Sequence, residues 1–370
     1  MKNIYALLLL LIPLSGFCNQ NAGFNITGTI QGLDTGTIEL IYRNHNGDDT
    51  TITAGITGGK FKLTGKIPEP ELARFNIRTG WVYNMAFFLE NTEQKISLVK
   101  NDDSQTKITG SYSNTIFETL EPQQRRFFAD ARNYDNAHQQ AINNHNAQAA
   151  IAADSVWAAQ QHQWFSTIRS AITAEPKNYA GLYFIKWLLF HPPGYDTIMS
   201  LFMRLDPVVR NGPSGKDFMT SLQHYKKISV GQPAPEISGK DTSGNPQKLS
   251  SLKGQIVLLD FWASYCGICR QTNPQLKAVY EKYHAAGFEI LSVSLDYERS
   301  AWVKAIQADK LPWPQVSELR GGAAASAGVY DVQDLPRNWL IDRNGNIIAH
   351  DLSIADLSQR LEQLLRVKGK

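Results

Sequence analysis

The chain has 370 residues, of which 42% are hydrophobic and 19% are charged, and its formal net charge is +3. This length is sufficient for two or three domains. The balance of 37 basic against 34 acidic residues is too even to suggest a nucleic-acid-binding protein, and no Lys/Arg tract is present.

Residues 1–18 have the pattern of a secretory signal peptide. The apolar run at residues 4–14 is too short to span a bilayer and is interrupted by Pro13. Cys18 raises the alternative of a lipid anchor, but the bulky Phe17 stands where a lipoprotein signal has a small residue. We therefore expect cleavage after Cys18 and a periplasmic protein, with a membrane-anchored lipoprotein as the less favoured alternative.

Residues 24–111 are expected to form an all-β, sandwich-like domain. Strand patterns alternate with turn signals such as Asn46-Gly47 and Gly58-Gly59. The predicted strands lie at residues 24–30, 37–42, 61–67, 73–78, 87–90 and 96–99. The segment contains no convergent acids, metal-ligand spacing or phosphate loop, so we interpret it as a structural or partner-binding module.

Residues 114–225 are expected to be helical. Alanine is frequent within residues 130–163, and alanine favours helix. An apolar face follows and ends at Glu175-Pro176, with further helices predicted at residues 179–190, 198–209 and 217–225. The spacing of the three histidines of this region does not suit a metal pair, and we expect them to be solvated: His138, His145 and His162.

The clearest chemistry lies in residues 256–283. The apolar run at residues 256–259 has the composition of a strand buried on both faces, and apolar residues then recur at helical spacing. Cys266 and Cys269 therefore lie where a strand turns into a helix. Unpaired N–H groups at a helix start stabilise a thiolate, so Cys266 is the candidate nucleophile. Cys269, one turn later, is close enough to form a disulfide with it.

Two alternatives to catalysis are a structural disulfide and half of a zinc site. Zinc requires four ligands, and the chain has no second Cys-x-x-Cys and no His-x(3–5)-His. After removal of the leader, Cys266 and Cys269 are the only cysteines, which is not the pattern of a disulfide-stapled scaffold. We expect a redox-active pair, no metal and no cofactor.

Three separated segments resemble one family. Residues 257–274, VLLDFWASYCGICRQTNP, resemble the active-site segment of thioredoxin-fold proteins. Residues 230–235 and 330–342 resemble the entry sequence and the cis-proline segment of the TlpA/ResA-like branch of envelope thiol–disulfide oxidoreductases, which are related to AhpC/TSA proteins. The resemblance covers roughly residues 228–365 and implies an α/β thioredoxin fold for residues 228–370.

The order of predicted elements agrees with this resemblance. A hairpin around Gly244-Asn245 precedes the strand at residue 256 and the cysteine-bearing helix. Further elements are predicted at residues 288–295, 300–308, 338–342 and 347–350, with a last helix after a capping box at residues 353–356. The β-rich segment before them resembles the small domain of unknown function found before thioredoxin modules in some Gram-negative envelope proteins.

Asp260 lies within the apolar strand, six residues before Cys266. Burial of a carboxylate is unfavourable and raises its pKa. The resemblance implies that Asp260 accepts the proton of Cys269, directly or through water. The alternative is a strand-end aspartate that is merely hydrogen-bonded by a neighbour.

The resemblance also implies a substrate-binding set. Pro336 is expected to follow a cis bond and to pack against the disulfide, whereas an ordinary trans proline is the alternative. The backbone of Leu335 would pair with an extended substrate peptide. Trp262 is expected to cover the edge of the site, and Tyr265 stands directly before the first cysteine.

Several residues depart from the family pattern. Tyr265 replaces the usual tryptophan, and Thr272 stands where envelope reductases often have a glutamate. Arg337 follows the expected cis-proline in place of a small residue, and Gly267-Ile268 differs from the Gly-Pro of thioredoxin. These changes affect the expected redox potential and substrate preference rather than the mechanism.

The sequence thus predicts a periplasmic enzyme that exchanges Cys266–Cys269 with disulfides of substrate proteins. By resemblance we favour reduction, of the kind used in cytochrome c maturation, which requires a membrane thiol electron donor. The alternatives are a thiol-dependent peroxidase and a non-catalytic envelope protein that binds peptides in the thioredoxin groove. The peroxidase is disfavoured because the residues before Cys266 contain no Pro-x-x-x-Thr/Ser-x-x-Cys pattern. The oligomeric state is not predicted.

Overall fold

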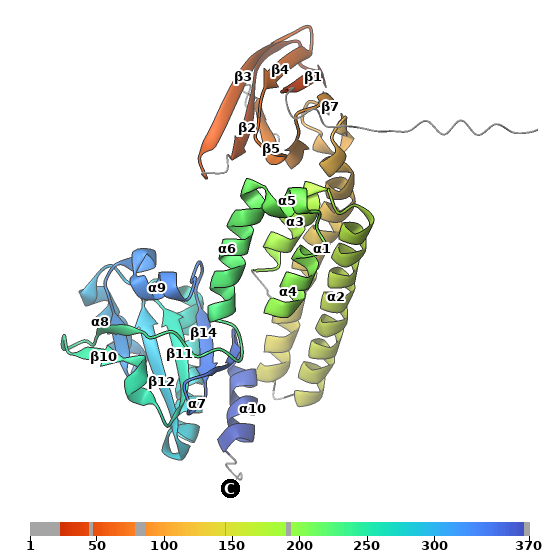
Figure 1. Ribbon diagram of the computed structural model, residues 1–370. Helices are drawn as coiled ribbons and strands as arrows, with labels where there is room; N and C mark the ends of the chain where they lie inside the picture. Colours follow the sequence, from red (N-terminus) through yellow and green to blue (C-terminus); the bar gives the residue numbers. More distant parts are fainter. Residues whose placement is uncertain (1–22, 44–46, 78–85, 145, 190–193, 366–370) are drawn as a thin grey trace, which may run out of the picture. The chain divides into compact units, whose positions relative to one another are not determined.

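The computed structural model describes residues 23–43, 47–77, 86–144, 146–189 and 194–365 (Figure 1). The predicted signal peptide, with Cys18, lies outside these ranges. The chain divides into two compact units, the first comprising residues 1–134, 155–185 and 204–215, and the second residues 135–154, 186–203 and 216–370. Among the described residues, no helix has the length and apolar content needed to cross a bilayer.

The expected all-β domain is confirmed as a mixed sheet. Its described strands follow the order β6-β5-β2-β3-β4-β1-β7-β8, in which β1 and β7 are parallel. Their bounds are β1 (Phe24–Gln31), β2 (Thr35–Arg43), β3 (Asp49–Thr57), β4 (Lys60–Gly65), β5 (Glu71–Ile77), β6 (Ala86–Leu89), β7 (Glu93–Val99) and β8 (Lys107–Thr109).

This sheet curls around its own core. Strands β4 and β5 are separated by β2 and β3, which in a flat sheet would place them about 14 Å apart. The rings of Phe61 on β4 and Phe75 on β5 nevertheless lie 5.8 Å apart. Phe75 also stacks on Phe87 of β6 at 4.9 Å. The inward-facing residues of the curled sheet therefore form one hydrophobic core.

The expectation of a helical region after the sheet is also confirmed. Its helices are α1 (Tyr112–Asn143), α2 (Ala147–Ala174), α3 (Tyr179–Trp187), α4 (Tyr195–Phe202), α5 (Pro207–Asn211) and α6 (Pro213–Lys227). In the first unit, α1 and α2 pack through aromatic side chains, with Phe127 stacked on Trp157 at 5.0 Å and on Trp164 at 5.8 Å. Helix α2 ends before Pro176, as the sequence indicates.

One histidine of this region differs from expectation. His138 is buried rather than solvated, and its Nε2 lies 3.1 Å from Oδ1 of Asp154. The reason is that α1 and α2 pair, so a polar residue can be covered by the facing helix and still find a partner. His162 is exposed as expected, and His145 lies outside the described residues.

The beginning of α1 is joined to the β-sheet within the first unit. Glu90, which follows β6, accepts hydrogen bonds from the backbone amides of Tyr112 at 2.7 Å and Ser113 at 2.8 Å. A carboxylate at this place satisfies N–H groups that a helix start leaves unpaired. Phe88 also contacts Phe117 of α1 edge to face, at 5.5 Å. Sheet and helix therefore share one packed interface.

The second sheet has the expected thioredoxin-like architecture. Its order is β10-β9-β13-β12-β11-β14-β15, with β11, β12 and β13 parallel and β14 antiparallel to β11. The strands are β9 (Ser238–Lys240), β10 (Pro246–Lys248), β11 (Ile256–Trp262), β12 (Phe288–Ser294), β13 (Gln315–Ser317), β14 (Arg337–Ile341) and β15 (Ile347–His350). The helices are α7 (Gly267–Tyr283), α8 (Arg299–Asp309), α9 (Ala325–Val329) and α10 (Ile354–Leu365).

Strand β11 is buried on both faces along its whole length. The face that carries Leu258 and Trp262 packs in one hydrophobic cluster with residues of α7, α8 and α10. The opposite face carries Phe261, whose ring lies 5.6 Å from that of Tyr330 and 5.7 Å from that of Trp339. Because β11 is paired on both sides and covered on both faces, its carboxyl end is a rigid base for the residues that follow.

Candidate active site

The two cysteines form a disulfide at the start of α7. Their sulfurs are 1.98 Å apart and their Cα atoms 5.3 Å apart. Cys266 occupies the N-cap position of α7, and its Sγ accepts a hydrogen bond from the amide of Cys269 at 3.2 Å. The helix start thus directs an N–H group at the sulfur that would become the thiolate.

The two sulfurs differ in access to solvent. Cys266 is half-buried, whereas Cys269 is only 2% exposed and packs in the hydrophobic cluster beneath α7. An incoming disulfide can therefore reach Cys266 and not Cys269. This asymmetry suits an attacking cysteine followed by a resolving one.

A buried carboxylate that the sequence interpretation did not identify holds the loop before Cys266. Asp296, 2% exposed at the end of β12, accepts hydrogen bonds from the amide and hydroxyl of Ser264 and, at 2.7 Å, from the hydroxyl of Ser294. β11 and β12 are parallel neighbours, so their carboxyl ends lie side by side. The available sequence signal was the position of Asp296, an aspartate that follows the second buried strand.

The first turn of α7 is held by a second unpredicted group. Asp309, the last residue of α8, pairs with the Arg270 guanidinium and accepts a hydrogen bond from the Asn273 amide at 2.7 Å. Arg270 also donates to the backbone carbonyl of Ser264 at 3.4 Å. Both ends of the cysteine-bearing turn are thereby attached to neighbouring elements.

Asp260 is buried on the same face of β11 as Trp262, the face covered by α7. It is 9% exposed, and Ser292 Oγ donates a hydrogen bond to its Oδ2 at 2.8 Å. Burial raises the pKa of Asp260 to about 6, and the hydrogen bond from Ser292 opposes that rise. A carboxyl group with such a pKa exchanges protons near neutral pH, as an acid–base group requires.

A groove of about 390 Å³ opens beside Cys266. Its lining residues come from the loop before α7, the start of α7 and the segment before β14: Tyr265, Cys266, Gly267, Ile268, Leu295, Gly322, Val332, Gln333, Asp334 and Leu335. The peptide bond between Leu335 and Pro336 is cis. The exposed Tyr265 is fixed by a hydrogen bond from its hydroxyl to the carbonyl of Leu295 at 3.1 Å. The groove thus combines an accessible sulfur with mostly apolar walls, to which Gln333 and Asp334 add polar groups.

Trp262 does not lie where the resemblance implied. It is 1% exposed, and its indole Nε1 donates to Gln315 Oε1 on β13 at 3.0 Å. The expected position at the site edge is therefore corrected, because Trp262 belongs to β11 and its side chain points under α7. Its role here is support from within the core.

The unusual residues of the site have local partners. Arg337 forms a two-point ion pair with Asp351, at 2.6 and 3.0 Å, and its guanidinium lies 5.5 Å from the Trp339 ring centre. Thr272 donates its hydroxyl to the backbone carbonyl of Cys269 at 3.0 Å. Neither side chain places an additional acid beside the sulfurs.

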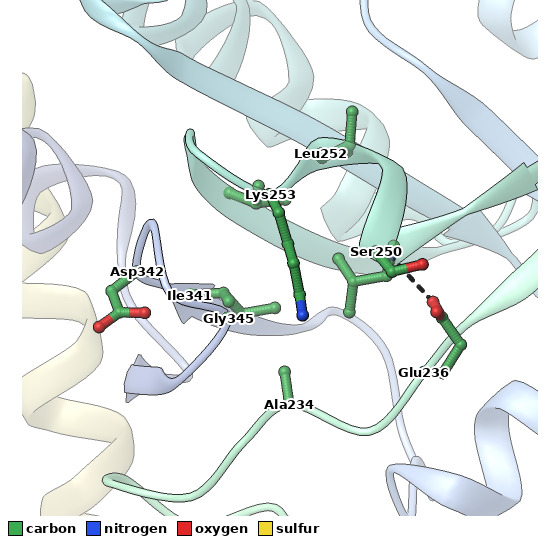
Figure 2. A pocket seen from close by; sticks show the side chains of 10 residues that line it. Ala234, Glu236, Ser250, Leu252, Lys253, Ile341, Asp342 and Gly345 are labelled. Carbon is green, nitrogen blue, oxygen red and sulfur yellow. Dashed lines mark hydrogen bonds between the residues drawn. The ribbon is translucent and has the colours of Figure 1, made fainter.

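A second pocket lies at the other end of β11, and Figure 2 shows its lining. Its volume is about 130 Å³, and Lys253 reaches across it. Glu236 accepts hydrogen bonds from the amides of Ser250 and Ile237, both at 3.1 Å, and Asp342 accepts from backbone amides of its own turn. Both carboxylates are thus occupied by hydrogen bonds from backbone amides, so we do not consider the pocket a candidate active site.

One group of possible metal ligands occurs among the described residues. Atoms of His138, Asp154 and Asp356 lie within 4.8 Å of one another. His138 and Asp154 pair with each other. The Asp356 amide donates to the Ser353 hydroxyl, as the capping box predicted, and that hydroxyl donates to the Asp356 carboxylate. We assign no metal to this group.

Comparisons with known proteins agree with this geometry. The model of the AhpC/TSA family matches residues 230–350, and that of a domain of unknown function, DUF4369, matches residues 24–117. The thiol-disulfide oxidoreductase ResA of Bacillus cereus is 29% identical over 157 residues, which cover 41% of this chain and 88% of that protein.

Among solved structures, the thioredoxin domain of a thiol-disulfide oxidoreductase from Bacteroides vulgatus is 35% identical, with a TM-score of 0.35. The alignment covers 37% of this chain and 97% of that domain. A thiol-disulfide oxidoreductase from Bacteroides fragilis is 33% identical, with a TM-score of 0.35, and the alignment covers 36% of this chain and 99% of that protein. The chain therefore contains an AhpC/TSA thioredoxin-fold domain at residues 230–350 and a DUF4369 domain at residues 24–117, and it is similar to thiol–disulfide oxidoreductases.

Proposed function

We propose that the protein is an exported, periplasmic oxidoreductase that reduces disulfides of substrate proteins with the dithiol form of Cys266 and Cys269. The observation that supports this most is the difference between the two sulfurs. Cys266 is accessible and receives an N–H group at a helix start, while Cys269 is buried directly behind it. Export is supported by the signal-peptide pattern of residues 1–18.

The first step is attack on the substrate. The Cys266 thiolate bonds to one sulfur of the substrate disulfide, and the other substrate sulfur leaves as a thiolate that takes a proton from solvent. The product is a mixed disulfide between Cys266 and the substrate. Leu335 and Tyr265 line the groove in which the substrate chain would lie.

The second step releases the substrate. Cys269 gives its proton to Asp260 and bonds to Cys266 Sγ, which breaks the mixed disulfide and frees the second substrate thiolate. The substrate has then gained two electrons, and Cys266 and Cys269 are oxidised to the disulfide seen in this structure. A membrane thiol donor would return the two electrons for the next cycle.

The proposal is tested with Cys266→Ser and Cys269→Ser variants in a protein disulfide reduction assay. We expect Cys266→Ser to abolish turnover, because the attacking sulfur is lost. Cys269→Ser should accumulate the mixed disulfide, visible by mass spectrometry under non-reducing conditions, because the resolving sulfur is lost. Turnover that survives in Cys266→Ser would refute the assignment, and consumption of hydrogen peroxide without a dithiol partner would favour a peroxidase instead.

A further inference from the structure

Ser292 and Trp313 are connected to the buried carboxyl group of Asp260 by two hydrogen bonds. Trp313 Nε1 lies 2.8 Å from Ser292 Oγ, and Ser292 Oγ lies 2.8 Å from Asp260 Oδ2. The three side chains are 3%, 1% and 9% exposed, in the same order from Trp313 to Asp260. A hydrogen-bonded chain of this kind is shielded from competition by water.

The backbone fixes the position of each member of this chain. Asp260 on β11 and Ser292 on β12 are direct partners in the parallel register. The amide of Ser292 donates to the carbonyl of Pro314 at 3.0 Å, which holds the segment with Trp313 against β12. The strand register and this backbone hydrogen bond therefore place the serine hydroxyl between the indole and the carboxyl group.

The chemistry of the groups sets the direction of the hydrogen bonds. An indole N–H only donates, so Ser292 Oγ accepts from Trp313. The serine hydroxyl has one proton, and among the described residues its acceptor is Asp260 Oδ2. Oδ2 is thus kept as an acceptor, and a proton that Asp260 takes up must bind to Oδ1.

We propose that Ser292, oriented by Trp313, is a positioning residue for Asp260 that stabilises the ionised carboxylate and directs proton uptake to Oδ1. This inference rests on the proposed function, in which Asp260 accepts the proton of Cys269. That proton moves to Oδ1 as the Cys269 sulfur bonds to Cys266, and the Ser292 hydroxyl keeps its own proton throughout.

Other charges near Asp260 do not replace this interaction. Arg270 and Asp309 pair with each other, Arg337 pairs with Asp351, and Asp296 is bonded by two serines. The elements around Asp260 carry further titratable groups. They are Cys266 at the N-cap of α7; Cys269, Arg270, Lys277, Tyr280, Glu281, Lys282 and Tyr283 on α7; Arg299, Lys304 and Asp309 on α8; Glu289 on β12 and Asp296 after it; Arg337 on β14; and Asp356, Arg360 and Glu362 on α10. Among the described residues, the pKa of Asp260 responds to burial and to the Ser292 hydrogen bond, not to these charges.

The test follows the titration of Asp260 directly, in the full-length oxidised protein, by the ¹³C shift of its carboxyl group in NMR. Ser292→Ala removes a donor to the carboxylate, so the titration midpoint should rise by about one pH unit. Trp313→Phe removes only the N–H that orients the serine and should raise the midpoint by a smaller amount. It also serves as the second variant should Ser292→Ala fail to fold.

Ser294→Ala is the matched control, because Ser294 lies on the same strand and donates to Asp296 instead of Asp260. It should leave the Asp260 midpoint unchanged. An unchanged midpoint in folded Ser292→Ala or Trp313→Phe would overturn the inference, as would an equal shift in Ser294→Ala.

Kinetics separate this inference from the proposed function. The rate of mixed-disulfide resolution should fall at low pH as Asp260 becomes protonated, and Ser292→Ala should move that fall to higher pH. In an Asp260→Asn background, Ser292→Ala should have no further effect on the pH profile. A low-pH fall that persists in Asp260→Asn would refute the base role of Asp260, whereas a fall that Asp260→Asn removes and Ser292→Ala does not move would refute the positioning role alone.

Discussion

At the scale of single residues, burial assigns different chemistry to groups that lie close together in the sequence. Cys266 and Cys269 are three residues apart, yet one reaches solvent and the other does not. Asp260 is buried without a cationic partner among the described residues, so its pKa is raised to about 6 chiefly by loss of hydration. The site thus holds a carboxyl group whose charge changes within the physiological pH range.

This burial predicts a pH-dependent stability. The pKa of Asp260 is higher in the folded than in the unfolded protein, so its contribution to stability is complete below about pH 4 and is lost as pH rises through about 6. Asp260→Asn removes the charge, so above pH 7 the variant should be more stable than the wild type by about 2 to 3 kcal/mol.

The measurement is the free energy of unfolding of oxidised protein in urea, from pH 4 to pH 8. The difference between variant and wild type should shrink toward low pH, where Asp260 is protonated. A difference that does not vary with pH would contradict the raised pKa of Asp260.

Sequence alone predicted the disulfide between Cys266 and Cys269, the burial of Asp260 and the cis bond before Pro336, because each residue stands in a short contiguous motif. It did not identify Asp296 or Ser292, whose partners come from other strands and depend on the register of β11 against β12. It also misplaced Trp262, because alternation along a strand buried on both faces does not reveal which side chains approach the surface.

At the scale of elements, α7 is tied to α8 next to the reactive sulfur. Arg270 follows Cys269 directly, and Asp309 binds both Arg270 and Asn273. A partly buried ion pair with an added amide donor restricts the first turn of α7 more than an exposed pair could.

Asp309→Asn should therefore loosen that turn. We expect a loss of about 1 to 3 kcal/mol in the free energy of unfolding and faster hydrogen exchange at the amides of Cys269 and Arg270. The control is Glu281→Gln, which breaks an exposed pair with Lys277 on the same helix and should change stability by less than about 0.5 kcal/mol. Equal effects of the two variants would show that the Arg270–Asp309 pair has no special role.

The elements that escaped prediction have weak local signals. Strand β3 has only two large apolar residues, Ile52 and Ile56, which alternate with threonine and glycine, so its apolar face is weakly marked in the sequence. Strands β8 and β13 have three residues each and are defined by their neighbours in the sheet. Long periodic elements such as α10 and the fully apolar start of β11 were predictable because packing and local propensity agree there.

At the scale of the whole molecule, the chain has two compact units with separate cores. In the first, the Glu90 carboxylate caps α1, so the β-sheet and the helices should unfold together. The residues proposed for the chemistry, from Asp260 to Pro336, lie within the AhpC/TSA match and within the second unit.

Glu90→Ala should separate these two units in calorimetry. Loss of the cap leaves two helix amides without a partner, so the free energy of unfolding of the first unit should fall by about 1 to 2 kcal/mol and its transition should move to lower temperature. The second transition and the rate of disulfide exchange should not change. Glu93→Ala, an exposed glutamate on β7, is the control and should move neither transition; a shift of both transitions in Glu90→Ala would show that the units unfold as one.

The unequal exposure of the two sulfurs has a kinetic consequence. A protein that supplies electrons must attack the disulfide at Cys266, the same atom through which electrons later leave, because Cys269 is covered. The electron donor and the substrate protein must consequently bind in turn to the same surface around Cys266, and never at the same time. Steady-state rates measured against both should give parallel double-reciprocal lines, and an excess of either protein should inhibit the other.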